Sequence, residues 1–177
     1  GGLGNDRYIV DHPGDRIIEG GNGGLDRVGT SVSLMLSDNV ENAWVIGGAP
    51  VNLTGNILDN RLTGNGSANI LDGGGGADTM LGGRGSDVYI VDNPGDVVRE
   101  KAYGGTDTVR SLISYVLAPQ VENGILIGTA ATNLTGNALD NNLLGNSAAN
   151  VLDGGRGNDR LTGGGGADTF VFGPKAG

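Results

Sequence analysis

A nine-residue period runs through this chain and constrains its fold more than any other feature. The most regular motif is GGRGSDVYI, residues 82–90. Motifs of this kind begin at Gly1, Gly55, Gly64, Gly73, Gly82, Gly136, Gly145, Gly154 and Gly163. A short repeat that recurs at fixed spacing predicts a solenoid, in which each unit packs only against its neighbours.

Two positions of the motif carry most of the information. Position eight is apolar or aromatic throughout: Tyr8, Leu62, Leu71, Met80, Tyr89, Leu143, Leu152, Leu161 and Phe170. Position six is aspartate in the glycine-rich motifs (Asp6, Asp78, Asp87, Asp159, Asp168) and asparagine in the others (Asn60, Asn69, Asn141, Asn150). Residues 10–18 and 91–99 keep this register, with Asp15 and Asp96 at position six.

A second, longer period contains the first. Residues 1–81 align with residues 82–162 without a gap, and residues 163–177 begin a third copy. We therefore expect one continuous solenoid cut from a longer chain. If two nonapeptides make one coil, the long repeat spans about four and a half coils. Corresponding loops of successive copies would then lie on opposite edges, unless an insertion adds half a coil.

The segments between the motif blocks are predicted to be strand pairs. Residues 109–117 form a β-branched and apolar run, followed by a turn at 118–120 and a second strand over 121–127; residues 28–46 repeat this pattern. The preceding GGLD and GGTD, which end at Asp26 and Asp107, resemble the motif shifted by two residues and are predicted to bulge one coil. No helix is expected, because glycine costs about 1 kcal/mol per helical position relative to alanine.

Three strand residues and six turn residues per motif predict a coil with a short strand on each of two faces. Position eight then points inward. Glycines permit positive φ, so backbone carbonyls can face inward and join the aspartates in a column of oxygen ligands suited to Ca²⁺. Carboxylates stacked at ~4.8 Å repel one another, so a cation is needed between the coils. The free energy of metal binding then contributes to the free energy of folding.

Composition and the remaining residues exclude several other classes. A net charge of −9 and no cysteine argue against nucleic-acid binding, disulfides and thiolate metal sites. There is no GK[ST] phosphate loop and no EF-hand motif, and repetition argues against a unique catalytic site, so we do not expect an enzyme. His12 is interpreted as a turn residue and Trp44 as a packing residue rather than a sugar platform. Glu41 and Glu122 are interpreted as local structural residues rather than metal ligands.

The motifs GGRGSDVYI, GGLGNDRYI, GGGGADTML and GGRGNDRLT resemble the RTX, or haemolysin-type, calcium-binding repeats. The intervening VENxxL and LTGNxLDN segments also look like the long repeats of large RTX proteins. The resemblance implies an all-β, right-handed parallel β-roll with several bound Ca²⁺ ions. It also implies type I secretion from a Gram-negative bacterium, folding outside the cell, and an extracellular or cell-surface location.

The resemblance further implies which atoms bind calcium. One loop supplies the carbonyls of positions two and four and its position-six side chain, and the loop two motifs later supplies positions one, three and six. Gly74, Gly76 and Asp78 would thus face Val91, Asn93 and Asp96, while Gly83, Gly85 and Asp87 would face the shifted loop that ends at Asp107. Asn65, Ser67 and Asn69 would face Gly82, Arg84 and Asp87. Asn137, Leu139 and Asn141 would face Gly154, Arg156 and Asp159, and Asn146, Ala148 and Asn150 would face Gly163, Gly165 and Asp168.

Further candidate ligands by the same pattern are Gly2, Gly4, Asp6, Asp15, Asp26, Asn60, Gly73, Gly75, Gly155, Gly157, Gly164 and Gly166. The asparagine loops offer only neutral oxygens. Two interpretations stay open for them: weak or empty metal sites, or a hydrogen-bonded ladder that replaces calcium.

Two function classes remain. The first is a structural or adhesive repeat region of a large secreted or cell-surface protein. The second is a secretion, folding or carbohydrate-docking module of a secreted enzyme of the alginate epimerase, lipase or protease type. Expected partners are calcium ions, further copies of the chain joined end to end, and an extracellular polysaccharide; nucleic acid and a membrane span are not expected.

Overall fold

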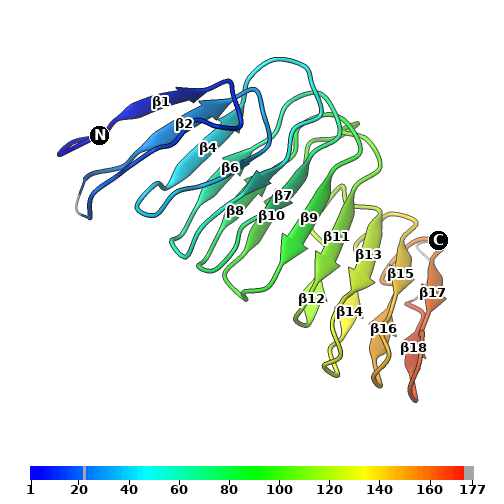
Figure 1. Ribbon diagram of the computed structural model, residues 1–177. Coiled ribbons are helices and arrows are strands. Elements are labelled where there is room, and N and C mark those ends of the chain that lie inside the picture. The colour runs from blue at the N-terminus through cyan, green and yellow to red at the C-terminus, as the bar shows by residue number, and fades with distance from the viewer. Residues whose placement is uncertain (22, 174–177) are drawn as a thin grey trace.

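The computed structural model of the chain describes residues 1–21 and 23–173; the last four residues of the predicted third copy lie outside this part. It is an all-β solenoid of about nine turns, consistent with a β-roll, and its described residues contain no helix. Figure 1 shows the coils stacked side by side from the N-terminus to the C-terminus. The predicted fold class is confirmed.

Three parallel sheets form the walls of the solenoid. Sheet A contains, in spatial order, β1 (Arg7–Val10), β2 (Arg27–Thr30), β4 (Asn42–Val45), β6 (Arg61–Thr63), β8 (Thr79–Leu81) and β10 (Val97–Arg99). Sheet B contains β3 (Leu34–Met35), β5 (Leu53–Thr54), β7 (Ile70–Asp72), β9 (Val88–Val91), β11 (Thr108–Ser111), β13 (Asn123–Leu126), β15 (Asn142–Leu144) and β17 (Arg160–Thr162). Sheet C contains β12 (Tyr115–Val116), β14 (Leu134–Thr135), β16 (Val151–Asp153) and β18 (Thr169–Val171).

The chain alternates between two walls, as the short repeat predicts. From β2 onward successive strands belong to sheet A and sheet B in turn, and after β10 sheet C takes the place of sheet A. Leu62 pairs with Met80 and Met80 pairs with Val98, so one coil takes two nonapeptides. In the regular motifs the strands occupy positions seven to nine, for example β6, β7 and β8.

The two long copies are half a coil out of phase. β1 lies in sheet A, whereas β9, the equivalent strand of the second copy, lies in sheet B. The same exchange separates β2 from β11 and β6 from β15. Corresponding turns of the copies therefore lie on opposite edges of the solenoid, as the count of four and a half coils predicts.

The core is a stack of buried apolar side chains, to which the strands contribute one or two residues each and the turns contribute others such as Val40 and Val121. Position eight is fully buried within the solenoid, at Leu62, Leu71, Met80, Tyr89, Leu143 and Leu152. The prediction that this position points inward is confirmed. Towards the ends the stack is less covered, and Phe170 is 45% exposed because no further coil packs on it.

The prediction of strand pairs over 28–46 and 109–127 is confirmed for the turn at 118–120 and for the second strand, β13, which pairs with β11, but it is wrong for the first strand. Residues 109–117 do not form one strand, because β11 ends at Ser111 and β12 begins at Tyr115 in another sheet. The chain turns where Ser111 Oγ donates to the Ile113 carbonyl at 2.8 Å and accepts from the Ile113 N–H at 3.2 Å. Thr30 and Val32 form the same corner in the first copy.

The predicted bulge after the GGLD and GGTD segments is confirmed. The backbone N–H of Asp6 donates to Asp26, and that of Asp87 donates to Asp107, each over 20 residues. The equivalent bond elsewhere spans 18 residues, as between Asn60 and Asp78. These two coils therefore carry two extra residues at the edge where the acidic side chains gather.

Candidate metal centres in the turns

The position-six aspartates are tied to the coil before them by one oxygen each. Asp78 Oδ1 accepts the backbone N–H of Asn60 at 2.7 Å, and Asp87 Oδ1 accepts that of Asn69 at 2.7 Å. Asp96 Oδ1 accepts the N–H of Asp78 at 3.0 Å. These bonds join turns that lie one coil apart, in the order that the sequence predicts, and they leave the second oxygen of Asp78 and Asp87 buried.

That second oxygen has no partner at four aspartates. Asp26, Asp78, Asp87 and Asp107 are at most 1% exposed, and within the described part of the chain their Oδ2 atoms accept no hydrogen bond. A buried carboxylate oxygen without a donor is costly. Burial raises the pKa of Asp78 to about 6 and that of Asp87 to about 6. Orphaned anionic oxygens of this kind fit a hard cation such as Ca²⁺.

The glycines of these turns hold conformations that other residues avoid. Gly74 and Gly76 have φ of 76° and 116°. A side chain on Gly73 would collide with the Asp78 carboxylate. Positive φ recurs at positions two and four of the other glycine-rich turns, at Gly4, Gly83, Gly85, Gly155, Gly157, Gly164 and Gly166. The prediction that glycine supplies positive φ in these turns is confirmed.

The asparagine turns are built differently. Asn60 Oδ1 accepts the N–H of Asn56 at 2.7 Å, while Asn60 Nδ2 donates to the carbonyls of Val40 at 3.1 Å and Glu41 at 3.2 Å. Asn69, Asn141 and Asn150 make the equivalent bonds. Positions two and four of these turns do not adopt positive φ. The structure therefore places the asparagines in the hydrogen-bonded ladder that was one of the two open interpretations.

Some predicted site residues shape turns instead of facing a metal centre. Asp15 is exposed and accepts the N–H groups of Asp11 and His12. Asp96 Oδ2 accepts the N–H groups of Asp92 and Asn93 at 3.1 Å each, so neither of its oxygens is orphaned. His12 Nδ1 accepts the N–H of Gly14 at 3.0 Å, which confirms its interpretation as a turn residue.

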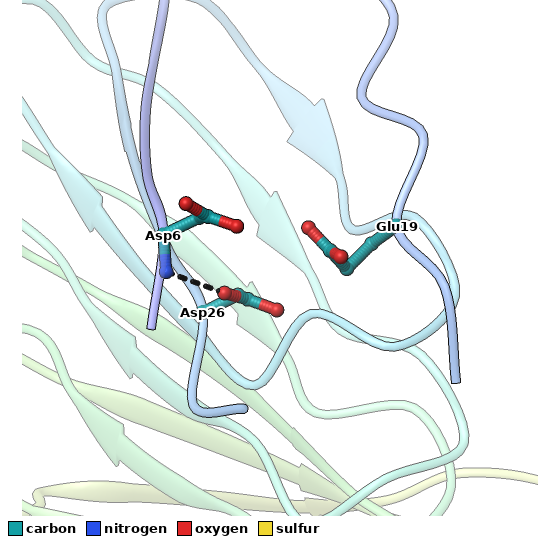
Figure 2. A group of neighbouring side chains, drawn as sticks. All are labelled: Asp6, Glu19 and Asp26. Atoms are coloured by element: carbon teal, nitrogen blue, oxygen red, sulfur yellow. Dashed lines mark hydrogen bonds between the residues drawn. The ribbon is translucent and has the colours of Figure 1, made fainter. Parts of the chain in front are cut away.

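The structure adds two acidic residues that the sequence interpretation missed. One carboxylate oxygen from each of Asp6, Glu19 and Asp26 lies within 4.8 Å of the others, and Figure 2 shows the three groups turned towards a common space. Asp87, Glu100 and Asp107 form the same cluster in the second copy. The sequence did contain a signal for these two residues, because Glu19 and Glu100 occupy the same place in the two long copies. They lie outside the nonapeptide register and so escaped a search by motif position.

Each cluster glutamate is held by a tyrosine. The Tyr8 hydroxyl donates to Glu19, and the Tyr89 hydroxyl donates to Glu100. Burial raises the pKa of Glu100 to about 7, with a further contribution from the charge of Asp107. The hydrogen bond from Tyr8 instead lowers the pKa of Glu19. The N-terminal ammonium also lies 3.4 Å from Glu19 Oε2.

Glu41 and Glu122 have the local role that was predicted for them. Glu41 Oε2 accepts the N–H of Asp26 at 2.7 Å, and Glu122 Oε2 accepts the N–H of Asp107 at 2.8 Å. They thus continue the ladder of side-chain oxygens and backbone N–H groups beyond each bulged turn.

Comparison with known proteins agrees with this geometry. Stacked parallel coils with acidic, glycine-rich turns define a calcium-binding β-roll as the class of fold. Residues 54–89 and 135–170 match the family described as RTX calcium-binding nonapeptide repeat, in four copies. The repeats in these two ranges are of the RTX calcium-binding type, and repeats of this type bind Ca²⁺. No curated protein and no solved structure matches the chain.

The two matched ranges lie 81 residues apart, and each runs from the end of one long copy into the start of the next. The acidic clusters that include Glu19 and Glu100 extend outside them. No helix in the described part of the chain has the length and hydrophobicity to cross a membrane.

Proposed function

We propose that this chain is a calcium-dependent structural or adhesive repeat region of a large secreted or cell-surface bacterial protein, folding on Ca²⁺ after type I secretion. The observation that carries the proposal is the set of four buried carboxylate oxygens without a hydrogen-bond donor. Such a column is stable only when cations neutralise it, so the folded state depends on the calcium concentration around the protein.

The proposed ligands are the position-six carboxylates together with inward carbonyls of the glycine-rich turns. Asp78, Asp87, Asp159 and Asp168 supply the charge in the regular coils. Asp15 and Asp96 are not proposed as principal ligands, because their Oδ2 atoms already accept backbone N–H groups. The asparagine turns are proposed to hold no ion, since their amide groups are already paired.

Coupling of folding to calcium binding would keep the chain unfolded during export and let it fold outside the cell. One buried apolar side chain per nonapeptide contributes about 2–3 kcal/mol, whereas ordering each residue of the backbone costs about 1–2 kcal/mol. At low calcium the chain stays unfolded and suited to export, and at the higher calcium outside the cell it folds. The long repeats then extend as a stiff spacer or adhesive array.

Self-association is the proposed route to longer assemblies. β1 and β18 are terminal strands of sheets A and C, so each leaves one row of backbone N–H and C=O groups without a neighbouring strand. Edges of this kind add a further strand, either from the next repeat or from another copy. Light scattering at increasing calcium should show growth of the particle; a folded monomer at high concentration would argue against assembly through the edges.

Limited proteolysis tests the proposed function directly. In calcium the chain is expected to resist a nonspecific protease, and in chelator or in Mg²⁺ alone it is expected to be digested, because Mg²⁺ demands compact octahedral geometry. Equal digestion in calcium and in chelator would contradict calcium-dependent folding.

A second candidate, a carbohydrate-docking module, is favoured by one surface. Arg7, Arg27 and Arg61 lie in register on sheet A, and Trp44 lies beside them with the Arg7 guanidinium 5.3 Å from its ring centroid. Gly29 leaves room for the indole, because a side chain there would contact it. The second copy does not repeat this surface, because Thr108 stands at the place of Arg27 and Ile125 at that of Trp44.

An arginine strip with an aromatic ring, on a chain of net charge −9, suits a polysaccharide that carries carboxylates. Titration with alginate should change the Trp44 fluorescence, whereas neutral dextran should not. The variant Arg27→Gln should weaken that response, and Arg160→Gln, in the last coils, serves as the control. No response to alginate would leave the structural role as the sole proposal.

A further inference from the structure

We propose that Asp87, Glu100 and Asp107, and equally Asp6, Glu19 and Asp26, form a separate class of calcium site in which a glutamate outside the nonapeptide supplies the third carboxylate. This inference rests on the proposed calcium-dependent function and adds to it two ions, one for each bulged coil, at sites that the nonapeptide register does not define.

The second cluster shows convergence on a shared space. Asp87 and Asp107 are each 1% exposed, and their Oδ2 atoms have no donor among the described residues. One oxygen of Glu100 lies within 4.8 Å of both aspartates. A side chain on Gly82 would collide with the carboxylates of Asp87 and Glu100 and with the Tyr89 hydroxyl. The three acidic groups thus face one another beside a position at which only glycine fits.

No lysine or arginine in the described residues forms an ion pair with this cluster. Within residues 1–21 and 23–173 the sole ion pair joins the Gly1 ammonium to Glu19, in the first cluster. Asp87 and Asp107 each use their Oδ1 atom on a backbone N–H, from Asn69 and Asp87 respectively, and their second oxygens stay free for a ligand. Three carboxylates at this separation are held together only by a cation or by protons.

The two-residue insertion explains why this site differs from the regular ones. In a regular pair the two turns are 18 residues apart, but Asp87 and Asp107 are 20 apart. The shifted turn still stacks, since the Gly85 N–H donates to the Gly104 carbonyl at 2.6 Å. Glu100 lies between β10 and this turn, and a side chain on Gly104 would approach its Oε2 to 2.9 Å. The glutamate therefore enters the bulged coil where no nonapeptide residue is available.

The tyrosine fixes the glutamate as a ligand. Tyr89 is fully buried in the apolar stack, and its hydroxyl donates to Glu100. This bond orients the carboxylate in the way that outer groups orient ligands in metal sites. Because Tyr8 and Glu19 repeat the arrangement on the opposite edge of the solenoid, the cluster is a property of the long repeat and not of one local surface.

The chemistry selects a hard cation of high charge. Three carboxylates give a formal charge of −3, and charge count is the main determinant of calcium affinity at oxygen sites. We expect these to be the tightest sites of the chain, occupied before the regular turns, and to bind Tb³⁺ in place of Ca²⁺.

The test is a calcium-binding isotherm of the whole chain, measured by calorimetry for the wild type, Glu100→Gln and the control Asp38→Asn. Asp38 is exposed and removal of its charge matches that of Glu100. Glu100→Gln is expected to lose one tight ion or to bind it at least tenfold more weakly, with the weaker sites retained. Asp38→Asn is expected to keep the wild-type isotherm.

Wild-type binding by Glu100→Gln would overturn the inference while leaving calcium-dependent folding intact. Absence of calcium-induced structure in the wild type would instead overturn the proposed function itself. If Glu100→Gln does not fold in excess calcium, Glu100→Asp decides, because it keeps the charge but retracts the carboxylate. Loss of the same tight ion in Glu100→Asp supports the inference, and wild-type binding overturns it.

Discussion

Two kinds of turn stack on one another in this solenoid, and they satisfy the side chain at position six by different chemistry. The turn 73–78 has positive-φ glycines and a buried aspartate with an orphaned oxygen. The turn 55–60, one coil earlier, has an asparagine whose amide oxygen and nitrogen are both paired with backbone groups. Both turns lead into three-residue strands that pair in register, β6 and β8, so the difference lies within the turns, at position six and at the glycines of positions two and four.

The comparison shows how one solenoid can combine metal sites with metal-free coils. An amide has a donor and an acceptor, so it can join two coils without any other group. An aspartate has only acceptors, so after one backbone N–H is satisfied it requires a cation or a proton. The presence of both kinds of turn limits the number of ions that the solenoid requires.

The largest expected effect comes from the glycine that shapes the metal turn. Gly76 has a φ of 116°, and a Cβ there would lie 2.5 Å from the Leu58 carbonyl oxygen. Gly76→Ala is expected to destabilise the calcium-saturated protein by about 3 kcal/mol, measured by urea unfolding. Gly66→Ala, at a glycine of an asparagine turn with no atom within 4 Å, should change stability by less than about 0.5 kcal/mol. Equal losses would contradict the distinction between the turns.

The next effect tests whether one substitution can convert an asparagine turn into a metal site. Asn60→Asp removes the amide donor from the Val40 and Glu41 carbonyls and adds a charge next to Asp78. We expect a loss of about 2 kcal/mol in saturating calcium. Asn158→Asp adds the same charge at an exposed position and should be nearly neutral. A variant Asn60→Asp that gains a calcium ion without losing stability would show that the amide ladder is not required.

A smaller effect distinguishes the proposed calcium ligands from the asparagines of the hydrogen-bonded ladder. Asp78→Ala removes a charged ligand and should raise the calcium concentration at the folding midpoint at least tenfold, equivalent to about 1.4 kcal/mol. Asn69→Ala removes neutral hydrogen bonds and should lower stability with little change in the calcium midpoint. Calcium titrations followed by circular dichroism measure both, and equal midpoint shifts would contradict the proposed division of roles.

The smallest effect concerns pH in the absence of metal. Burial raises the pKa of Asp78 and Asp87 to about 6 and that of Glu100 to about 7. A raised pKa in the folded state favours folding below the unfolded pKa near 4, and this contribution is lost as pH rises through 6 to 7. Without calcium, β-structure should therefore increase between pH 8 and pH 5, by on the order of 1 kcal/mol per group. With calcium the trend should reverse, because protons compete with the ion. A calcium-free signal that does not change with pH would contradict this account.

The sequence predicts the coil in detail because each rule acts within nine residues. Alternation in a short strand fixes Leu71 and Met80 as inward residues, and glycine at positions two and four fixes the shape of the metal turns. The corner at Ser111 was missed because Leu112 and Ile113 look like strand residues. Its signal was a hydroxyl residue at the same place in both copies, Thr30 and Ser111.

The role of Glu100 could not be predicted from local rules. It meets Asp87 and Asp107 only because an insertion widens one coil and brings the residue after β10 to the edge. That contact joins three segments and depends on how the coils stack. The recurrence of a glutamate at this place in both copies, as Glu19 and Glu100, marks the two residues as important without showing what they contact.

Because of its column of buried carboxylates, the chain is proposed to fold only when calcium is bound. Far-ultraviolet circular dichroism of the chain, first in chelator and then during titration with calcium, tests this dependence. We expect a disordered spectrum in chelator at neutral pH and a cooperative rise of β-structure on addition of millimolar calcium, with Mg²⁺ a poor substitute. A β-structured spectrum in chelator that calcium leaves unchanged would contradict it.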